Sequence, residues 1–467
     1  MTQTNSPLIE ELTIQPVPAD KRTGSARHLF AVWFGVQVMP LTLVTGVLGP
    51  TVFGLGAAAS IVAIVVGNLI GAVFMALHSV QGAKLGVPQM IQARGQFGMY
   101  GSLLVLVVVI LMYLGFLASI IVLARDTLVA LAPGLDPTLA LVITTVVALV
   151  AVVFGYELIH RLNRILLVLF AIAVALVAVY VLRAAGSDTT GTVAQSFDLI
   201  GFVGMASIAA VWQIAYAPYV SDYSRYLPEE TPARTAFGYT FFGSILGAIP
   251  MMALGALLVT AAGGDGTIGQ LVDIMPGPVS AFVLAMLFLG AIDAAVINLY
   301  GPALCTLTFI QTFRPTWSPG AAARNTVATI TAGIAFVVAL FFADNFLVNY
   351  SSFIHFLMCL LIPWSVVNLV DYYLISKGHY DVASFSDANA GYGKYNIPAL
   401  VTYVVGFVVQ MPFMSGAFYT GWISAAMDGV DISWLVGSIV SFALYLALVR
   451  ARSTSRVEAV ASPSTVF

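Results

Sequence analysis

Long apolar runs separated by short polar breaks constrain this chain more than any other feature. The runs from Ile61 to Leu77, Leu103 to Leu123 and Ile165 to Leu182 contain no charged side chain. As a helix, each is long enough to cross a hydrocarbon layer of ~30 Å. Only 8% of all residues are charged, and the mean hydropathy is +0.98. The sequence therefore predicts a membrane protein with many spans.

Twelve apolar segments can be delimited by their flanking polar and turn-forming residues. They run roughly from Leu29 to Leu48, Leu55 to Leu77, Tyr100 to Leu123, Thr138 to Phe154, Ile165 to Leu182, Ile200 to Val220, Phe237 to Ala261, Val279 to Phe309, Val327 to Phe342, Phe346 to Leu374, Ile397 to Met414 and Trp434 to Leu448.

The basic residues are divided unequally between the two sides of these spans. Of the 18 Lys and Arg residues, only Arg125 and Arg183 fall on one side. The other sixteen are Lys21, Arg22, Arg27, Lys84, Arg94, Arg161, Arg164, Arg225, Arg234, Arg314, Arg324, Lys377, Lys394, Arg450, Arg452 and Arg456. By the positive-inside rule, both termini should be cytoplasmic and the protein should lie in the cell membrane. The first 26 residues lack the pattern of a cleavable signal, so the first span should direct insertion.

Several function classes find no support in the sequence. The basic residues are dispersed and the net charge is −3, which disfavours nucleic-acid binding. The chain has no HExxH, GxSxG or GxxxxGK[ST] motif, so no catalytic residue, cofactor or metal cluster is expected. Cys305 and Cys359 lie inside spans, where packing is the favoured role over a disulfide. His355 is interpreted as a packing residue.

Helix-breaking residues fall at related places in two spans. They are Gly35, Pro40 and Gly46 in the first span and Gly201, Gly204 and Pro218 in the sixth. A repeat of five spans is odd, so its second copy would insert inverted, and paired broken helices in inverted halves are typical of a transport site at the membrane midplane. Gly and Pro are also common in ordinary membrane helices. The breakers alone leave both interpretations open.

Five segments carry a resemblance to a known family. Gly82 to Gly98 reads GAKLGVPQMIQARGQFG, and Gln213 to Pro228 reads QIAYAPYVSDYSRYLP. The other three are VPADKRTGSARHLFAVWFG from Val17, INLYG from Ile297 and LVDYYLI from Leu369. Their order and content resemble the nucleobase:cation symporter-1 family, in its purine-cytosine permease branch.

The resemblance implies an all-α membrane fold of the LeuT type. Such a fold has a 5+5 inverted repeat with discontinuous helices one and six, plus two peripheral helices. We therefore expect a cytoplasmic tail over 1–27, a ten-helix transport core over 28–376 with repeats at about 28–183 and 199–376, a loop over 377–396, two peripheral helices over 397–450 and a tail over 451–467. Family members import nucleobases and related heterocycles with Na⁺ or H⁺.

Planar heterocycles are held by aromatic faces and read by amides at their edges. In the family, the third span supplies a stacking aromatic residue ahead of a Gly, which places Tyr113 there with Phe116 close by. Leu117 stands where an amide is often found, so the chain departs from the family there. From the sixth span, Tyr216 is the preferred second stacking face and Trp212 the alternative.

Two amides complete the expected substrate site. Gln213 could replace the amide lost at Leu117. Asn298 matches a family position whose amide contacts the ring, although a hydrogen bond between helices is the competing role.

Asp293 is the candidate for ion coupling, because a carboxylate within a span costs ~2.5 to 3.5 kcal/mol on insertion scales. Family members that use Na⁺ have hydroxyl residues about here, where this chain has Ile292 and Asp293. The carboxylate could bind Na⁺ together with carbonyls near Val38 to Leu41, or it could carry H⁺. The missing hydroxyls slightly favour H⁺, and a bond between helices is the alternative role.

Helix breaks and gating are assigned to Pro40, Pro218, Asp222 and Arg225. Asp371 lies at the cytoplasmic end of the tenth span, where an ion pair or gate contact is expected. Gly263 to Pro278 is a candidate external cap.

The sequence thus predicts a secondary active importer of a cytosine- or purine-type base. Another planar heterocycle, such as hydroxymethylpyrimidine, hydantoin or allantoin, is the alternative substrate. A passive channel and a membrane-embedded enzyme are the rival classes. The expected partners are the heterocycle and the bilayer, with no nucleic acid, no obligate protein partner and no cofactor beyond the coupling ion.

Overall fold

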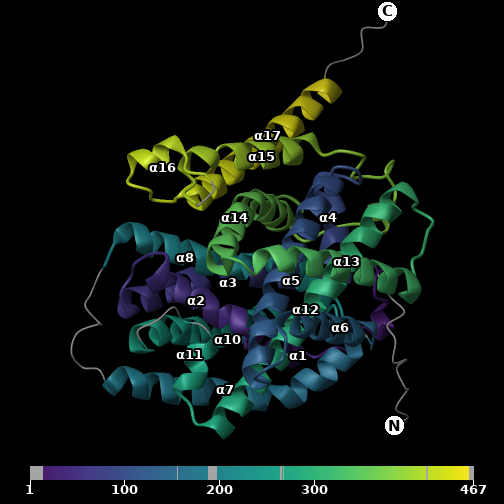
Figure 1. Cartoon of the computed structure of the whole chain (residues 1–467). Coiled ribbons are helices and arrows are strands. Elements are labelled where there is room, and N and C mark those ends of the chain that lie inside the picture. Colours follow the sequence, from purple (N-terminus) through teal and green to yellow (C-terminus); the bar gives the residue numbers. More distant parts are fainter. Residues whose placement is uncertain are drawn as a thin grey trace, which may run out of the picture.

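The fold was analysed in a computed structural model that describes residues 14–154, 156–187, 197–262, 266, 268–416 and 419–461. The predicted tails before residue 14 and after 461, and part of the predicted external cap, lie outside these residues. So do the side chains of Arg161, Arg164 and Arg456. The described residues form helices joined by short connections (Figure 1).

The first half of the chain forms seven helices. They are α1 (Ala26–Gly35), α2 (Pro40–Thr51), α3 (Ala57–Leu85), α4 (Gln89–Phe97), α5 (Ser102–Leu131), α6 (Pro137–Phe154) and α7 (Tyr156–Ser187). The rest forms α8 (Leu199–Ile214), α9 (Ala217–Ser224), α10 (Ala233–Ala262), α11 (Ile268–Asp273), α12 (Gly277–Phe313), α13 (Ala321–Phe342), α14 (Phe346–Val370), α15 (Ile397–Val408), α16 (Trp422–Ala426) and α17 (Ser433–Ala461). A π-helical turn, Asp371–Ile375, extends α14.

Each of the twelve predicted spans coincides with one of these helices or with a pair of them. Within the described residues, nine helices are long and apolar enough to cross a membrane, or ten if α1 and α2 count as one bent span. The fourth and eleventh predicted spans correspond to shorter apolar helices, Pro137–Val153 and Ile397–Phe413. The all-helical membrane fold is confirmed, and the count of twelve crossings stays a prediction.

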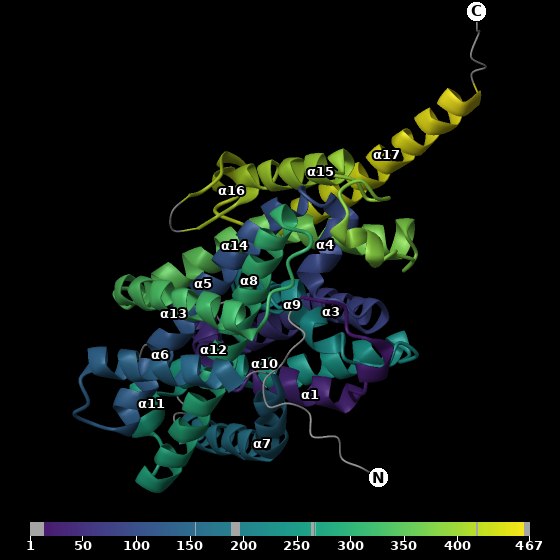
Figure 2. The same cartoon turned by 90° about the vertical axis from the view of Figure 1, so that its right-hand side faces the viewer.

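The centre of the molecule is built from helices distant in sequence. α3 packs against α8, α9 and α10, α12 packs against α5, and α10 also contacts α1 and α2. α15 and α17 lie together against α14 on one side of the bundle, as the yellow and light-green ribbons of Figures 1 and 2 show. The predicted peripheral position of the last two spans agrees with this arrangement.

The first predicted span is broken in the structure. α1 ends at Gly35 and α2 begins at Pro40, with a bend of 58° between them. Met39 is extended, and Pro40 occupies the first turn of α2, where its missing N–H costs no helical bond. The sixth span is interrupted at Ala215 and Tyr216, just before Pro218 in the first turn of α9. The predicted break of the first span is thus a sharp bend, whereas that of the sixth span is a two-residue interruption within Leu199–Ser224, which still counts as one continuous span.

The other glycines expected to mark the breaks serve close packing instead. Gly46 lies within α2, where an added Cβ would stand 1.8 Å from the Met252 carbonyl oxygen of α10. Gly201 and Gly204 lie within α8 against Phe53. Small residues of this kind let membrane helices approach closely and gain van der Waals contact. Gly46, Gly201 and Gly204 therefore do not mark helix breaks, and the prediction that they do was wrong.

The contact at Gly46 predicts a loss of stability on the smallest substitution. Gly46→Ala should lower the thermal unfolding midpoint of the purified protein, since overpacking costs about 1–3 kcal/mol and this contact is to backbone. Gly333→Ala is the matched control, because a Cβ at Gly333 in α13 meets no atom within 4 Å. Equal midpoints for the two variants would contradict the observed packing of α2 on α10.

Candidate functional site

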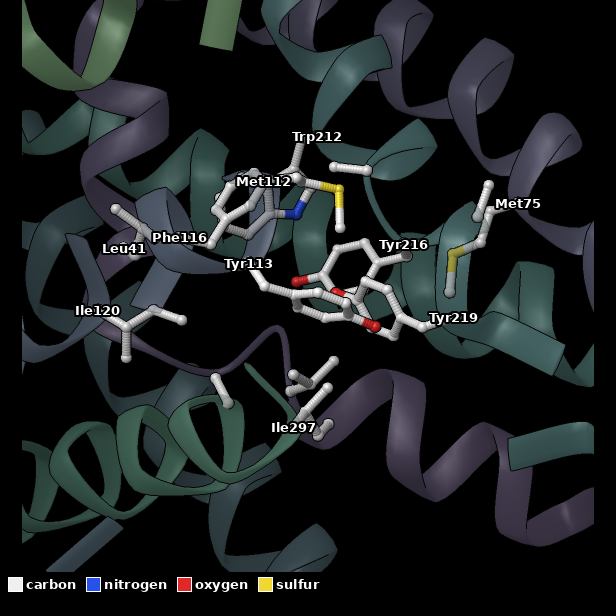
Figure 3. Packing of buried hydrophobic residues seen from close by; sticks show 14 of the residues in the cluster. Leu41, Met75, Met112, Tyr113, Phe116, Ile120, Trp212, Tyr216, Tyr219 and Ile297 are labelled. Atoms are coloured by element: carbon white, nitrogen blue, oxygen red, sulfur yellow. The ribbon is translucent and has the colours of Figure 1, made fainter. Parts of the chain in front are cut away.

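A cluster of buried aromatic rings lies where the two broken helices meet α5. Tyr113 of α5 stands 5.0 Å from Tyr219, measured between ring centroids, and Tyr219 stands 5.6 Å from Tyr216. Trp212 is 6.1 Å from Tyr216, and Trp33 of α1 is 5.7 Å from it. Figure 3 shows the rings of Tyr113, Tyr216 and Tyr219 converging beside Trp212. Each of these side chains is at most 5% exposed.

Phe116 extends the cluster toward α14. Its ring centroid is 6.0 Å from that of Trp212 and 5.2 Å from that of Phe353, edge to face in both cases. Phe353 fits beside α5 because Gly115 has no side chain, and a Cβ there would stand 2.2 Å from its ring. The structure thus brings together all four aromatic residues that the sequence selected for the substrate site.

A buried chain of hydrogen bonds ties the two broken helices together. The Trp212 indole Nε1 donates to Gln37 Oε1 at 2.7 Å, and Gln37 Nε2 donates to Ser244 Oγ at 3.0 Å. Ser244 Oγ donates to Gln213 Oε1 at 2.5 Å, and Gln213 Nε2 donates to Asn68 Oδ1 at 2.7 Å. Because both ends of the Gln213 amide are engaged by protein, this amide holds helices together in the observed conformation.

The sequence prediction missed several members of this site. Gln37, Ser244 and Asn68 were not selected, and neither were Trp33 and Tyr219. Gln37 stands between Gly35 and Pro40 in the predicted broken segment, so a polar residue at a helix break was an available indication. Asn68 is a lone amide within the second apolar run, and such residues face partners inside the bundle.

Asn298 is buried in α12 with half of its amide bonded. Its Nδ2 donates to the Ala294 carbonyl at 2.8 Å, and among the described residues its Oδ1 has no hydrogen-bond partner. Gly301, one turn further along α12, contacts the Tyr113 ring, whose hydroxyl also lacks a partner among the described residues. Two buried oxygen atoms without described partners, the Asn298 Oδ1 of α12 and the Tyr113 hydroxyl of α5, thus lie at or beside the segment 298–301. Buried polar groups generally find partners, and a bound polar ligand can supply them.

Asp293 lies beside the break of the first span. Its Oδ2 is 3.8 Å from the position that a Cβ on Gly35 would occupy. One turn earlier in α12, the Val38 carbonyl packs against Gly290, where a Cβ would stand 1.9 Å from the carbonyl oxygen. The Leu41 carbonyl accepts the Thr45 hydroxyl at 2.6 Å. Of the residues chosen for ion coupling, Asp293 thus lies one turn of α12 from the point where the Val38 carbonyl meets that helix. The Leu41 carbonyl already accepts a hydroxyl hydrogen bond. The described residues contain no group of three or more His, Cys, Asp or Glu side chains able to hold a metal.

Asp222 and Arg225, the residues expected to act in gating, each contact a neighbouring helix. Asp222 Oδ1 accepts the backbone N–H of Gln89 at 2.8 Å, at the first residue of α4. A carboxylate there is favoured by the positive end of the helix dipole. Arg225 Nη2 donates to the hydroxyls of Tyr226 at 2.9 Å and Tyr300 at 3.4 Å. The end of α9 is therefore fixed to α4 and α12.

The segment from Gly82 to Gly98 contains α4, and its Arg94 links this helix to two other parts of the chain. Arg94 is buried there and donates to four oxygen atoms, those of Thr308 O, Thr312 Oγ1, Gln311 Oε1 and Phe385 O. Burial lowers the pKa of Arg94 to about 10, so the guanidinium stays charged at neutral pH. Arg94 thus joins α4 to α12 and to the segment that follows α14.

Asp371 has hydroxyl partners among the described residues. Tyr445 donates to its Oδ2 at 2.6 Å, Ser376 to its Oδ1 at 3.1 Å, and Tyr380 to the same Oδ1. His355 bonds to the Ser351 carbonyl at 2.8 Å, as expected of a packing residue.

The expected external cap contains α11. A cavity of about 750 Å³ lies beside it, lined mainly by residues of α2, α5, α11 and the start of α14. Arg125 and Asp126 face this cavity and form an ion pair at 2.7 Å.

Comparison with known proteins gives one consistent result. A family model described as permease for cytosine/purines, uracil, thiamine, allantoin matches residues 16–437. The chain is 38% identical over 457 residues to the putative purine-cytosine permease YxlA of Bacillus subtilis, covering 96% of this chain and 97% of that protein. It is 24% identical to the purine-cytosine permease fcyB of Emericella nidulans, covering 94% and 88%.

The fold is similar to that of a solved transporter. The structure of Mhp1, a nucleobase-cation-symport-1 family transporter in a closed conformation with bromovinylhydantoin bound, has a TM-score of 0.76 at 18% identity and covers 96% of both chains. The inward-facing conformation of Mhp1 has a TM-score of 0.73 at 17% identity, covering 96% of this chain and 95% of Mhp1.

The buried amide chain predicts energetic coupling between Gln213 and Asn68. Gln213→Leu should lower the unfolding midpoint, because it leaves the Asn68 Oδ1 without its donor and the Ser244 hydroxyl without its acceptor. Hydrogen bonds between membrane helices are worth about 0.5–2 kcal/mol. In a cycle with Asn68→Leu, the double variant should lose less than the sum of the single losses. Strictly additive losses would show that the two amides do not interact.

Proposed function

Because this chain belongs to the family of permeases for cytosine and purines, uracil, thiamine and allantoin, we propose that it imports a cytosine- or purine-type base across the cell membrane by alternating access. The observation that carries the proposal is the buried aromatic cluster at the two helix breaks, with the partnerless oxygen atoms of Asn298 and Tyr113 beside it.

The base is held between the rings of Tyr113 and Tyr216. A flat heterocycle gains from stacking on aromatic faces, and both rings are supplied by elements at the breaks. In the observed conformation Tyr219 contacts both rings, with its centroid 5.0 Å from that of Tyr113 and 5.6 Å from that of Tyr216. Binding between Tyr113 and Tyr216 therefore requires Tyr219 to move aside, with Trp212 and Phe116 forming the adjoining wall.

Asn298 reads the polar edge of the base. Its Oδ1 is buried and has no described partner, so a ring N–H or exocyclic amine satisfies it without breaking a protein bond. Gln213 reaches substrate only by giving up its bonds to Ser244 and Asn68. We therefore place Asn298 first and Gln213 second in recognising the base.

Asp293 couples the driving ion to the break of the first span. Its position beside Gly35 and one turn from Gly290 at the Val38 carbonyl supports a role in sensing the geometry of that break. A proton neutralises the carboxylate, and Na⁺ is held by it together with the Val38 carbonyl. The proton is favoured, because hydroxyl residues do not flank this carboxylate in α12. Leu41 contributes less, since its carbonyl accepts from Thr45.

Movement is assigned to the broken helices. In the predicted orientation, Pro40 begins α2, the outer half of the first span, and Pro218 begins α9, the cytoplasmic half of the sixth span. Asp222 and Arg225 fasten the end of α9 to its neighbours. The distribution of Lys and Arg places both termini and these fastenings on the cytoplasmic side. Release of the base to the cytoplasm then requires the contacts of α9 to loosen.

A different planar heterocycle is the alternative substrate. Leu117 supplies no amide to the site, so the number of hydrogen bonds available differs from that expected for the family. The family description includes allantoin, and Mhp1 binds a hydantoin. A site with buried polar atoms discriminates strongly against rings that leave them unpaired.

Uptake into proteoliposomes tests the function and the role of Asn298. Radiolabelled cytosine, adenine and hypoxanthine are offered under an imposed Na⁺ gradient or, separately, an imposed pH gradient. We expect saturable accumulation of at least one base with one gradient. Asn298→Ala should raise its KM about tenfold or more, consistent with loss of a buried hydrogen bond, whereas Asn389→Ala in an exposed loop should not.

Uptake that does not saturate or ignores both gradients would indicate a channel, and a chemically altered product would indicate an enzyme. No uptake of any of the three bases would move the substrate to another heterocycle. An unchanged KM in Asn298→Ala would remove Asn298 from the site.

The coupling role of Asp293 predicts a separate effect. Asp293→Asn should abolish accumulation against a concentration gradient while equilibrium exchange of labelled base persists, because the amide neither binds H⁺ nor carries a charge for Na⁺. Asp273→Asn, at the exposed end of α11, is the control. Gradient-driven accumulation that survives Asp293→Asn unaltered would exclude the coupling role.

A further inference from the structure

A proline interrupts the backbone hydrogen bonds of α14. Pro363 lies within this helix and has no N–H, so the carbonyl of Cys359, four residues earlier, loses its helical partner. Both residues are buried. Inside a membrane such a freed carbonyl needs a donor from the protein, because lipid offers none. The structure supplies that donor from outside the predicted transport core.

Gln410 provides the missing hydrogen bond. It follows α15, and its Nε2 donates to the Cys359 carbonyl at 3.0 Å and to the Gly406 carbonyl at 2.8 Å. Both amide hydrogens are therefore used, and the side chain is 0% exposed. A residue of the predicted peripheral helices thus replaces a backbone hydrogen bond of α14, which stays continuous through Pro363.

Glycines of the peripheral helices make room for this arrangement. Gly406 of α15 lies against the Pro363 ring, since a Cβ there would stand 3.0 Å from Pro363 Cβ and 2.2 Å from Ser441 Oγ. Gly437 of α17 lies against Gln410, where a Cβ would stand 2.4 Å from Cδ of the glutamine. α15 and α17 therefore close around the proline and its substitute donor.

The half of α14 that follows the proline is fastened to α3 and α4. Trp364 stacks on His78, with ring centroids 5.0 Å apart. The Asn368 amide accepts from Gln81 Nε2 of α3 at 2.7 Å and donates to Gln96 Oε1 of α4 at 3.2 Å. Bonds at both ends of a buried amide hold this half of the helix to the core.

The half of α14 that precedes the proline is predicted to be the outer one, and it has fewer polar bonds. Among the described residues, one hydrogen bond joins it to a helix of the predicted core, between the Tyr350 hydroxyl and Thr45 Oγ1 of α2 at 2.8 Å. Tyr350 is the donor, because Thr45 donates to the Leu41 carbonyl. Phe353 of this half packs on Phe116 of the aromatic cluster. A bend at the proline would therefore move the part of α14 that contacts the cluster.

We propose that Gln410 is a positioning residue for transport, because it holds the outer half of α14 against the aromatic cluster. A bend at Pro363 carries the Cys359 carbonyl away from Gln410, which is fixed between α15 and α17. The hydrogen bond opposes that bend, so the peripheral helices set how readily α14 opens. This role in transport rests on the proposed function, in which a base reaches the cluster from the outer side.

Spin labels on α6 and α14 measure the bend directly. Leu139→Cys and Val348→Cys carry the labels, and Cys305→Ser and Cys359→Ser remove the native thiols while the carbonyl of residue 359 stays in place. Both labelled sites are exposed. Pro137 at the start of α6 and Val348 line the cavity beside α11, so the distance between the labels reports its width. Double electron–electron resonance on the purified protein gives this distance without any base or gradient.

Gln410→Met keeps the length of the side chain and removes both donors. A hydrogen bond between membrane helices shifts an equilibrium about three- to tenfold, so the population with the longer label distance should rise by this factor. In a Pro363→Ala background the helix regains its own bond to the carbonyl of residue 359, and Gln410→Met should then have no effect. Ser438→Ala is the control, since that hydroxyl bonds within α17 to the Trp434 carbonyl.

Identical label distances with and without Gln410→Met would overturn the proposal. The same shift in both backgrounds would also overturn it, because packing of the side chain and not its bond at the proline would then be responsible. If Gln410→Met alone fails to fold by size exclusion, Pro363→Ala should rescue it, and failure of that rescue would contradict the proposal. Uptake is measured separately, so a protein that shows the shift but carries no base would lose the proposed function and keep the hinge.

Discussion

A helix that breaks inside a membrane must have its freed polar groups satisfied by protein, because the hydrocarbon layer offers no water. At the break of the first span, backbone groups bond locally: the Gln37 N–H donates to the Phe34 carbonyl at 3.1 Å and the Val38 N–H to the Gly35 carbonyl at 3.0 Å. The side-chain hydrogen bonds Trp212–Gln37–Ser244–Gln213–Asn68 then join the break to the neighbouring helices. This chain of bonds runs from Trp212 of α8 to Gln37 at the break of the first span, then to Ser244 of α10. From there it returns to α8 at Gln213 and ends at Asn68 of α3. These bonds hold the indole of Trp212 and the break at Gln37 in place, so this side of the aromatic cluster is fixed.

The same region combines rigid and adjustable contacts. Glycines bring backbones together where helices must stay joined, as at Gly46 on Met252 and Gly290 on the Val38 carbonyl. The tyrosine rings at the breaks meet one another through side-chain contacts alone, which can be exchanged for contacts to a planar ligand. Rings that close on each other without ligand and separate to admit it would give the site two states, and alternating access requires such a difference.

Much of this was predictable, and the failures have physical causes. Apolar length and flanking charge located the apolar helices, and Pro40 and Pro218 located the two interruptions, because these effects are local in sequence. Family resemblance selected Tyr113, Trp212, Tyr216 and Asn298. The partners of Gln213 could not be foreseen, since Ser244 and Asn68 approach it only through packing of α3, α8 and α10. Gly201 and Gly204 were misjudged for the same reason: a glycine at a break and a glycine at a helix contact look alike until the neighbouring helix is known.

The central claim is that the base lies between Tyr113 and Tyr216 at the two helix breaks. A cryo-electron microscopy structure of the protein with a transported base tests it most directly. The account predicts planar density between these two rings, with Tyr219 displaced and the Asn298 Oδ1 within hydrogen-bond distance of the ligand. Density in the cavity beside α11, at Arg125 and Asp126, with the tyrosine rings still in mutual contact, would contradict it.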